Sequence, residues 1–367
     1  MNILHLPENI ASFISETVKL QNTSEDMRAR GVVYSDEMYS SVEYHDVEVR
    51  SKNNYEIKYR LKWFLKEGKR IFQFTKDVLW ADVIHWYWSD YIFESGLDFK
   101  IIKWLRKPVV VEWLGSEIRQ HNIENEVNLY YARECRKNPS VISLFCNEKS
   151  IELQRKFAHL KALPVLVRGA SILYHVDKNL FEKVFSTRHR IDLNKYKAML
   201  ISRYNDKPLI VHAPTDLNIK GTVYIQEAIR QLEAEGLMFE FKLLKDITRQ
   251  EVKHYIEKCD LFIDQLICGG YGMAATEAMA LGKPVMCYLH DTSLSEMQGD
   301  CPLINVNPDT IKEELRKLIV DENLRYEYAV KSREFTLRYY NSEVINAELR
   351  DIYLKAIHRD VWYSGNS

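Results

Sequence analysis

The sequence predicts an α/β protein with two doubly wound domains that face each other across a cleft. The chain has 367 residues, which is more than one hydrophobic core usually serves. Short apolar runs alternate with longer stretches of helical periodicity, as in repeated strand–helix units. Runs such as PVVVEW (108–113) are apolar almost throughout, which is typical of strands buried on both faces of a parallel sheet. Ligands of such sheets bind at the carboxyl ends of the strands, so we expect the site between the domains.

Composition excludes several other classes of protein. Hydrophobic residues make up 46% and charged residues 28%, which places the chain among folded globular proteins. A formal net charge of −1 leaves no overall basic field, so we expect no nucleic-acid partner. The N-terminus lacks a signal-like pattern and no apolar run is long enough to span a bilayer, which predicts a cytoplasmic protein. The six cysteines form no C-x-x-C pair, which favours buried free thiols over disulfides or zinc.

The first half of the chain contains five predicted strands and four predicted helices. The strands are expected at residues 2–6, 32–35, 82–87, 108–113 and 141–146. The helices are expected at residues 8–20, 55–67, 91–105 and 124–136. We expect a Rossmann-like domain over residues 1–170, followed by a less periodic linker over 171–206.

The second half repeats this order of elements. Strands are expected at residues 209–212, 239–244, 261–264, 284–288 and 303–306. Helices are expected at residues 222–235, 248–258, 272–281, 309–320, 322–339 and 342–358. We expect a second Rossmann-like domain over residues 207–340 and a C-terminal helical segment, 341–367, that can cross back to the first domain.

A glycine-rich turn in the second half is the most informative local feature. In the segment 260–288, Gly269, Gly270 and Gly272 precede MAATEAMAL, a run of good helix formers. Glycines let the backbone approach a ligand closely, and the helix start presents free N–H groups at a positive dipole end. Such a turn can hold a phosphate. The alternative is an ordinary strand–helix turn in which the glycines serve only geometry.

Glu277 in the following helix is a second candidate ligand-binding residue. Four nearby alanines allow the helix to pack close to the sheet and would keep this carboxylate near its ligand edge. A carboxylate can accept two hydrogen bonds from the vicinal hydroxyls of a ribose. The alternative is an exposed glutamate on the surface of the helix. Gly282 and Pro284 then end the helix.

This segment resembles the signature of the glycosyl transferases group 1 domain, the retaining family-four enzymes with the GT-B fold. That signature runs approximately D-x-F-x-x-P-S-x-x-E-G-F-G-x-x-x-x-E-A-M-A-x-G-K-P-V, and residues 260–285 align with it without gaps. The matched positions are Asp260, Phe262, Gly270, Gly272, Glu277, Ala278, Met279, Ala280, Gly282, Lys283, Pro284 and Val285, with Tyr271 in place of the phenylalanine. The resemblance implies two Rossmann-like domains in the GT-B arrangement, with Glu277 on the donor ribose.

A second segment, residues 209–228, resembles the strand–loop–KG–helix part of the same family. The resemblance implies that Lys220 contacts the donor diphosphate and that Gly221 opens the next helix. An ammonium at the edge of the sheet can neutralise a departing diphosphate. The alternative is a solvated loop lysine. The implied donor-binding residues are Thr215, Lys220, Gly221, Gly270, Tyr271, Gly272, Met273 and Glu277.

The sequence departs from the family pattern at three places near this predicted site. Gly269 stands where the family usually has a glutamate that contacts the transferred sugar, and Gln265 and Leu266 replace its Pro-Ser pair. Asp264 lies close enough in sequence to substitute for the lost carboxylate, so the candidate catalytic residues are Lys220, Glu277 and Asp264. The alternative for Asp264 is a set of local backbone hydrogen bonds. The arginine that usually precedes the KG lysine is absent from residues 216–219.

The first domain matches the family less closely. The run VVVEWLGSEIR (109–119) resembles a strand followed by a family loop, H-G-S-D-I-R, with Leu114 and Glu117 in place of His and Asp. The glycine-rich first loop of the family is reduced to PENIAS (7–12). Acceptor-side candidates are Gly115, Ser116, Glu117 and Arg119. The alternative is a local helix cap at Ser116.

Two basic and aromatic segments, 58–70 and 100–107, are candidates for contact with an anionic membrane surface. The alternative is that each is an amphipathic helix with its apolar side on the sheet and a solvated basic face. Since many family members act on lipid-linked acceptors, the resemblance is compatible with a peripheral position at the inner face of the membrane.

The resemblance implies a hexosyltransferase that uses a nucleotide-diphosphate sugar and a glycan or lipid-linked acceptor. It implies retention of anomeric configuration, no metal, no separate cofactor, and a setting in surface polysaccharide or glycoconjugate synthesis. The alternative we retain is a non-catalytic GT-B protein that binds a nucleotide sugar or serves as a partner subunit, motivated by Gly269 and Leu114. Epimerases and phosphorylases of this fold, and sugar-phosphate nucleotidyltransferases, lack matching signatures here.

Overall fold

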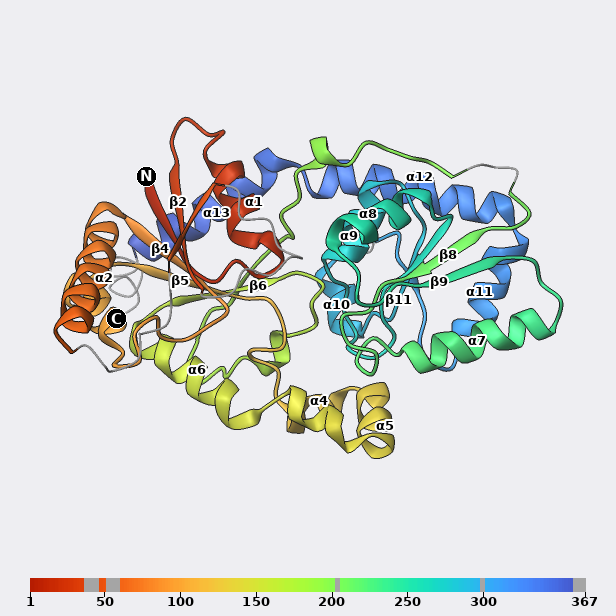
Figure 1. The fold of residues 1–367 in the computed structure, drawn as a ribbon, viewed down its shortest axis with the longest axis horizontal. Coiled ribbons are helices and arrows are strands. Elements are labelled where there is room, and N and C mark those ends of the chain that lie inside the picture. Colours follow the sequence, from red (N-terminus) through yellow and green to blue (C-terminus); the bar gives the residue numbers. More distant parts are fainter. Residues whose placement is uncertain (36–45, 51–59, 202–204, 298–300, 359–367) are drawn as a thin grey trace.

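The chain folds into two α/β domains, each built on a parallel sheet (Figure 1). The computed structural model describes residues 1–35, 46–50, 60–201, 205–297 and 301–358, and only the backbone over 60–66. The predicted fold class, two doubly wound Rossmann-like domains, is confirmed by this architecture.

The first domain contains a seven-stranded sheet within these residues, with strand order β3-β2-β1-β4-β5-β6-β7. The strands are β1 (Asn2–Pro7), β2 (Arg28–Tyr34), β3 (Val47–Arg50), β4 (Val83–Tyr87), β5 (Val109–Trp113), β6 (Leu163–Val167) and β7 (Phe185–Thr187). The helices are α1 (Phe13–Gln21), α2 (Arg60–Trp80), α3 (Leu97–Trp104), α4 (His121–Val127), α5 (Leu129–Lys137) and α6 (Asn147–His159), with 3-10 turns η1 (Ile10–Ser12), η3 (Pro139–Leu144) and η4 (Leu173–His175).

The second domain has a five-stranded sheet in the described residues, ordered β12-β11-β10-β8-β9. Its strands are β8 (Leu209–His212), β9 (Glu240–Leu243), β10 (Leu261–Ile263), β11 (Val285–Cys287) and β12 (Ile304–Asn305). Its helices are α7 (Thr222–Ala234), α8 (Arg249–Lys258), α9 (Met273–Ala280), α10 (Asp291–Glu296), α11 (Ile311–Val320) and α12 (Glu322–Tyr339).

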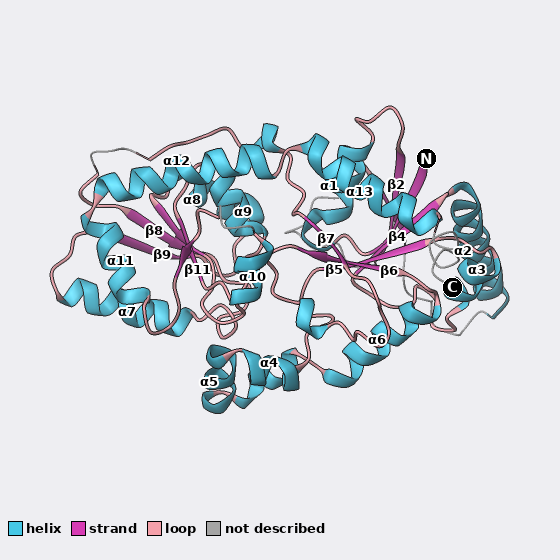
Figure 2. Cartoon of the chain, turned by 180° about the vertical axis from the view of Figure 1, so that it is seen from behind, coloured by secondary structure: helices cyan, strands magenta, loops and turns pink. Residues whose placement is uncertain are grey.

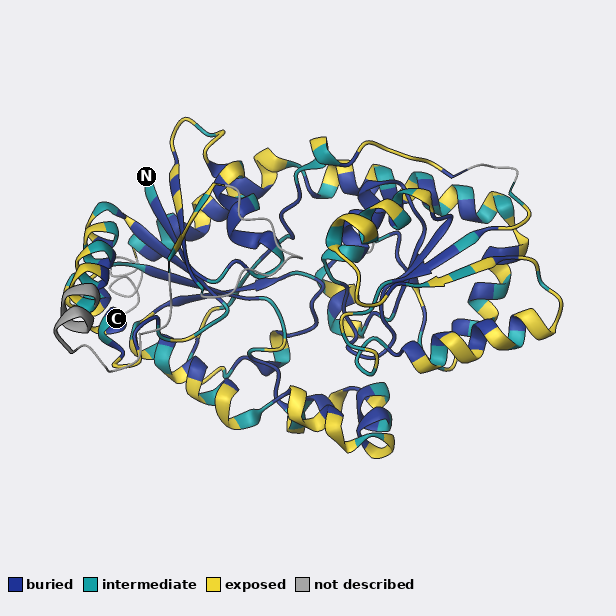
Figure 3. Cartoon of the chain, in the orientation of Figure 1, coloured by how far each residue is buried: buried dark blue, intermediate teal, exposed yellow. Residues whose placement is uncertain are grey.

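The central strands are buried on both faces, as parallel strands covered by helices must be. Every residue of β4, β5, β6, β10 and β11 is buried, whereas the outer faces of the helices are exposed (Figure 3). This explains why the strands read as continuous apolar runs in the sequence.

Each sheet has a point where the strand order reverses, and these points position the site. In the first sheet the order reverses between β1 and β4, and in the second between β8 and β10. The loops after the strands on either side of a reversal diverge to opposite faces and leave room for a ligand. The candidate residues Lys220 and Asp264 lie in the loops that follow β8 and β10, and Ser12 lies in the 3-10 turn η1 after β1.

Two stretches of chain join the domains along one side of the molecule, as the view from behind also shows (Figure 2). One is the segment after β7, with the short turn η5 (Leu193–Lys195). The other is the passage from α12 into α13 (Ser342–Ile357), which packs on α1, β4, β5 and β7 of the first domain. The expected linker, 171–206, differs from the structure at β7, which pairs with β6 and extends the first sheet to Thr187.

Several sequence predictions for local structure were wrong. The apolar run 141–146 is not a strand: its first part belongs to the 3-10 turn η3, and Val141 and Phe145 pack against Ile267 and Cys268 of the second domain. The sheet position is taken by β6 instead, although it contains Pro164, a residue type usually confined to edge strands. The helix expected over 124–136 is broken at Asn128, which caps α5 by accepting from two backbone N–H groups. The helix expected from residue 55 falls partly outside the described residues.

All six cysteines are free in the structure, as expected, and four of them are buried. Within the part of the chain that the structure describes, no helix is both long enough and apolar enough to span a membrane.

Candidate functional site

The centre of the candidate site is a lysine, a carboxylate and a helix start that converge where the second sheet reverses its strand order. Lys220, in the loop after β8, places its Nζ 2.6 Å from Oδ1 of Asp264. Asp264 follows β10, and its Oδ2 accepts a 3.0 Å hydrogen bond from the backbone N–H of Gly272 at the start of α9. The carboxylate therefore lies in a site for an anion, formed by a cation and the positive end of a helix.

The charge of this centre is well defined. Burial alone would lower the pKa of Lys220, but the Asp264 carboxylate outweighs burial and holds that pKa above its ordinary value. The Asp264 side chain is only 2% exposed, whereas that of Lys220 is 20% exposed, so the ammonium can be reached from outside. Lys220 is therefore a permanent positive charge at the carboxyl edge of the sheet.

A neutral histidine lies beneath this ion pair. His212 at the end of β8 has one ring nitrogen 2.8 Å from the carbonyl oxygen of Ile263 and the other 2.9 Å from the Thr222 hydroxyl. The carbonyl can only accept, so Nδ1 donates to it and Nε2 accepts from Thr222. Burial lowers the pKa of His212 to about 4, so the ring is uncharged at neutral pH. It links the strands without competing with Lys220 for Asp264.

The three glycines of the turn serve different purposes. Gly272 lies in open space, since a methyl group added there would meet no heavy atom within 4 Å. Gly269 has φ +70°, and a methyl group there would lie 2.7 Å from Cβ of His290. A methyl group added at Gly270 would lie 2.4 Å from the carbonyl oxygen of Gly169 in the first domain. Two of the glycines therefore allow close packing, and Gly272 alone borders free space.

Two other predicted donor-binding residues lie mainly in the junction between the domains. Tyr271 is buried, its N–H donates to the Gly169 carbonyl at 3.1 Å, and its hydroxyl lies 2.8 Å from that of Tyr340. Neither polar group of Tyr271 is available to a ligand in this arrangement. Met273 is half-buried, and its side chain packs against the hydrophobic cores of both domains.

The remaining two predicted donor-binding residues flank Lys220. Thr215 is exposed in the loop after β8. Gly221 is the N-terminal cap of α7 with φ +70°, a conformation that glycine adopts without strain. A methyl group at Gly221 would approach Cβ of Leu266 to 3.0 Å, so this glycine also lets the two loops of the site lie close together.

Glu277 faces the junction between the domains through an arginine that the sequence analysis missed. Its Oε1 accepts a 2.5 Å hydrogen bond from Arg249 at the start of α8. A second nitrogen of Arg249 donates to the hydroxyl of Ser12 in the first domain at 2.7 Å. Glu277 also raises the pKa of nearby Tyr196, after the larger effect of burial. Glu277 is thus held by residues of other elements and is not a freely solvated helix residue.

The loop after β1 keeps a glycine-like shape without glycines. Ala11 and Ser12 have φ of +47° and +65°, the left-handed region that glycine usually occupies. This strain of about 1–2 kcal/mol per residue is maintained by the surrounding structure. The strained conformation holds Ser12 where Arg249 can reach it, so the short loop PENIAS still contributes to the junction.

On the acceptor side, Glu117 binds its own loop. Its two carboxylate oxygens accept from the backbone N–H groups of Leu114 and Gly115, the latter at 2.9 Å. Burial outweighs these hydrogen bonds and raises the pKa of Glu117 to about 7. Ser116 is exposed and starts no helix, so the alternative of a helix cap at Ser116 was wrong. Gly115 has no heavy atom within 4 Å of an added methyl group, which leaves this part of the loop open.

Arg119 is buried in a second ion pair that sequence reasoning did not find. It donates to Glu124 at 2.9 Å and to the carbonyl oxygen of Ala170. Although burial opposes ionisation, Arg119 and His175 hold the pKa of Glu124 at about 2. Because Ala170 touches Gly270, Arg119 supports the contact between the domains. Its placement therefore favours a positioning role over direct contact with an acceptor.

Three important residues carried no sequence signal that the analysis used. Arg249 opens a helix whose start, T-R-Q-E, has the spacing of a capping box, and Thr248 and Glu251 do form one. That pattern located the helix but not the partner of Arg249. Glu124 and His212 lay in an expected helix and an expected strand, where only the fold reveals their partners.

The basic segments predicted for membrane contact differ from each other. The side chains of residues 58–66 are not among those that the structure describes. Arg70 turns inward, where it pairs with Glu67 and lies over the ring of Phe93. In the segment 100–107, by contrast, Trp104 is 78% exposed. In the described residues, no group of three or more His, Cys, Asp or Glu side chains could hold a metal ion.

The two domains have the GT-B fold, and in the second domain a lysine, a carboxylate and a helix start converge where the strand order reverses. Residues 179–335 match the family model described as "Glycosyl transferases group 1". An uncharacterized glycosyltransferase of Methanocaldococcus jannaschii, MJ1178, is 26% identical over 320 residues, which cover 83% of each chain. These matches confirm the resemblance to glycosyl transferases group 1 that the signature indicated.

Two solved structures share the fold over nearly the whole chain. Anabaena Alr3699/HepE in complex with UDP and glucose has a TM-score of 0.58 at 14% identity, covering 96% of this chain and 98% of that one. Sucrose-phosphate synthase of Thermosynechococcus elongatus has a TM-score of 0.60 at 11% identity, with both chains covered completely. At these identities the likeness concerns the fold.

Proposed function

We propose that this protein transfers a hexose from a nucleotide-diphosphate sugar to a glycan or lipid-linked acceptor, with retention of anomeric configuration. The observation that carries the proposal is the convergence of Lys220 and the start of α9 on one carboxylate where the strand order reverses. A site that binds a buried carboxylate through a cation and a helix N–H has the chemistry to bind a phosphate. The exposure of Lys220 and the open space at Gly272 give a diphosphate access to it.

In this proposal Lys220 and the Gly272 N–H bind the donor diphosphate, and Glu277 binds the ribose. The bond between the anomeric carbon and the phosphate oxygen breaks, and a new bond forms to the acceptor oxygen. The acceptor hydroxyl proton passes to the departing phosphate. Charge that accumulates on the leaving diphosphate is stabilised by the Lys220 ammonium and the dipole of α9.

Asp264 has a defined place in this scheme. Since it already occupies the partners of the diphosphate, donor binding replaces its contacts with Lys220 and Gly272. The displaced carboxylate remains beside the glycine turn, where it substitutes for the family glutamate that Gly269 replaces. This role requires no metal ion and no separate cofactor.

The setting of the reaction belongs to the same proposal. The exposed Trp104 within a basic segment supports contact of the first domain with an anionic membrane surface. A location in the cytoplasm, at the inner face of the membrane, follows from the use of nucleotide sugars and a lipid-linked acceptor. Surface polysaccharide or glycoconjugate synthesis is the corresponding process.

Ligand binding tests the donor site first. Isothermal titration calorimetry with UDP, GDP and ADP, each with and without an attached hexose, should identify one nucleotide. Lys220→Met and Glu277→Gln should each weaken its binding, whereas Lys242→Met, on the exposed surface of the same domain, should not. Lys220→Met leaves Asp264 unpaired, so the double variant Lys220→Met/Asp264→Asn is needed to exclude loss of the fold.

The transfer reaction is then measured with the nucleotide sugar that binds. Loss of Lys220 should lower the rate about 10²–10³-fold, the size expected when one group that stabilises developing charge is removed. Binding without turnover, with any acceptor offered, would support the non-catalytic alternative. Absence of binding by every nucleotide would contradict the proposal as a whole.

A further inference from the structure

A basic pocket lies at the edge of the first sheet opposite to the candidate site. It has a volume of about 680 Å³ and is bordered by Pro108, Val109 and Leu163, at the amino ends of β5 and β6. The acceptor-side loop and the Gly169 turn follow the carboxyl ends of the same two strands. The pocket is therefore separated from the donor and acceptor loops by the length of the sheet.

The charge of this pocket is of one sign. Its lining includes Lys103, Arg106, Lys107, His159 and Lys161, and among the described residues that line it none is Asp or Glu. Because the whole chain has a formal net charge of −1, this is a local concentration of positive charge. Charges of one sign gathered in a concave surface raise the local concentration of ligands of the opposite sign.

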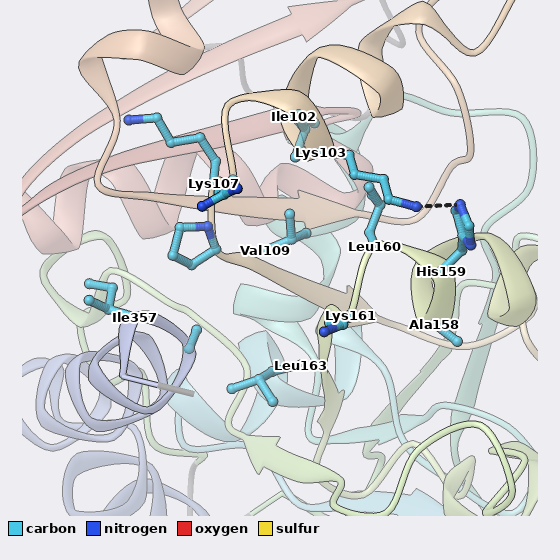
Figure 4. Close-up of a pocket in the computed structure, with 13 residues that line it drawn as sticks. Ile102, Lys103, Lys107, Val109, Ala158, His159, Leu160, Lys161, Leu163 and Ile357 are labelled. Carbon is cyan, nitrogen blue, oxygen red and sulfur yellow. Dashed lines mark hydrogen bonds between the residues drawn. The ribbon is translucent and has the colours of Figure 1, made fainter. Parts of the chain in front are cut away.

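Part of this charge has a structural explanation. Lys107 donates to the carbonyl oxygens of Leu79 and Ala81, at the end of α2, at 3.2 and 2.6 Å. Lys103 donates to the ring of His159 at 2.8 Å, as Figure 4 shows. These side chains lie near helix C-termini, where cations are favourable. They would be expected there without any ligand.

Arg106 and Lys161 have no such explanation. Both are exposed, and within the described part of the chain neither side chain has a hydrogen-bond or ion-pair partner. Arg106 follows α3 and Lys161 follows α6, with φ of +51° and +54°. At this position after a helix glycine is the usual residue, because other residues are strained there. The chain therefore places an unpaired cation at two equivalent positions where glycine would be more stable.

We propose that this pocket binds a phosphate group, carried by a lipid headgroup or by a soluble phosphorylated molecule. Arg106 and Lys161 supply the unpaired charges, and Lys103 adds a third. The pocket lies beside the C-terminal ends of α3 and α6, which offer carbonyl groups and no free N–H groups, so side chains must hold the phosphate. Trp104, on the helix that leads to Arg106, would contact the surface from which a lipid headgroup projects.

The test uses the double variant Arg106→Gly/Lys161→Gly. Glycine adopts the left-handed conformation without strain, so the variant should melt at the same temperature as the parent or higher. Any loss of binding then reflects the lost charges and not unfolding. The matched control is Lys242→Gln/Lys245→Gln, which removes two exposed cations from the other domain. Lys220→Met removes phosphate binding at the candidate donor site, so failure of that site can be recognised separately.

Two measurements distinguish the sources of the phosphate. The first is flotation with vesicles of phosphatidylcholine, with and without phosphatidylglycerol; the second is calorimetric titration with inorganic phosphate. Binding to the anionic vesicles only identifies a headgroup, and saturable binding of inorganic phosphate identifies a soluble ligand. In either case the glycine variant should bind about 30-fold more weakly, since each cation near an anionic surface contributes about 1 kcal/mol, or roughly fivefold.

Three outcomes would overturn the proposal. The first is that the parent protein binds neither probe. The second is that the glycine variant binds as well as the parent. The third is that the control variant on the other domain loses binding to the same extent as the glycine variant. Loss of binding in Lys220→Met alone would assign the phosphate to the candidate donor site instead.

Discussion

The donor-side loop after β10 and the acceptor-side loop after β5 both carry charged residues at a sheet edge, yet they use them differently. Asp264 links Lys220, from the loop after β8, to the backbone N–H of Gly272 at the start of α9, and Lys220 can be reached from outside. Glu117 and Arg119 instead bind the backbone of their own domain and a buried partner. The first arrangement is suited to exchange one anion for another, and the second holds loops in place. A charged residue near a predicted site is thus evidence for ligand binding only when its partners can be replaced.

The largest effect on stability should come from the buried pair in the first domain. Arg119→Met leaves Glu124 buried beside His175 without its main counter-charge. Breaking such a pair typically costs 3–5 kcal/mol, so the free energy of unfolding should fall by about that much. Denaturant titration measures it, with the donor affinity of the folded fraction measured alongside.

The control for this prediction replaces both charges. Arg119→Met/Glu124→Gln removes the unpaired carboxylate and should recover much of the lost stability. If Arg119→Met remained fully stable but lost activity with one acceptor, Arg119 would contact the acceptor and the distinction between the loops would fail.

The next effect concerns Gly269, where the family usually has glutamate. Gly269→Glu should not restore a sugar contact but should destabilise the protein by about 2 kcal/mol or more, because φ is +70° and a Cβ would clash with His290. Thermal unfolding measures this. Gly272→Ala, in open space, is the matched control and should retain its melting temperature more closely. A Gly269→Glu variant with unchanged stability and a higher transfer rate would show that the turn readily accepts the family glutamate.

A smaller effect is expected at Arg249, which positions Glu277. Arg249→Met should raise the KM for the donor about tenfold and change kcat less, because the carboxylate loses its orientation but remains present. Arg249→Lys can still reach one partner and should recover part of the affinity. If both variants instead lost donor affinity equally, and kcat fell as much as the affinity, Arg249 would contact the reacting groups.

The sequence predicted the donor side better than the rest of the molecule for a physical reason. A strand, a close turn and a helix start must follow one another directly to present backbone N–H groups, so residues 260–285 carry their geometry in local spacing. The structure brings the predicted residues Asp264 and Gly272 into contact, and β10, α9 and β11 lie where they were expected. The fold class followed from the same alternation of elements.

Elements whose role depends on distant partners were not predictable in this way. The run 141–146 is as apolar as a strand because it packs on Ile267 and Cys268 in the other domain. Pro164 lies inside β6, between β5 and β7, contrary to its usual preference for edges. Arg249 pairs with a helix residue on one side and with the loop after β1 on the other. No local pattern encodes contacts of this kind.

The smallest effect should be a pH dependence that originates from Glu117. Its pKa is raised from 4.5 to about 7 by burial. Between these two values the folded protein binds more protons than the unfolded chain, so this group makes stability fall as pH rises through that window. Above the higher value the contribution no longer changes.

Glu117→Gln removes this titration and should flatten the dependence of melting temperature on pH between about 5 and 7 by a few degrees at most. Glu117→Asp is the control, because it keeps a titrating group but shortens its reach to the N–H groups of Leu114 and Gly115. Donor affinity should be the same in all three proteins at each pH, since the donor centre around Lys220 contains no group from this loop. A pH-dependent loss of donor affinity in Glu117→Gln would show that the two loops act on one ligand, and would end the distinction between a loop that exchanges anions and a loop that only supports them.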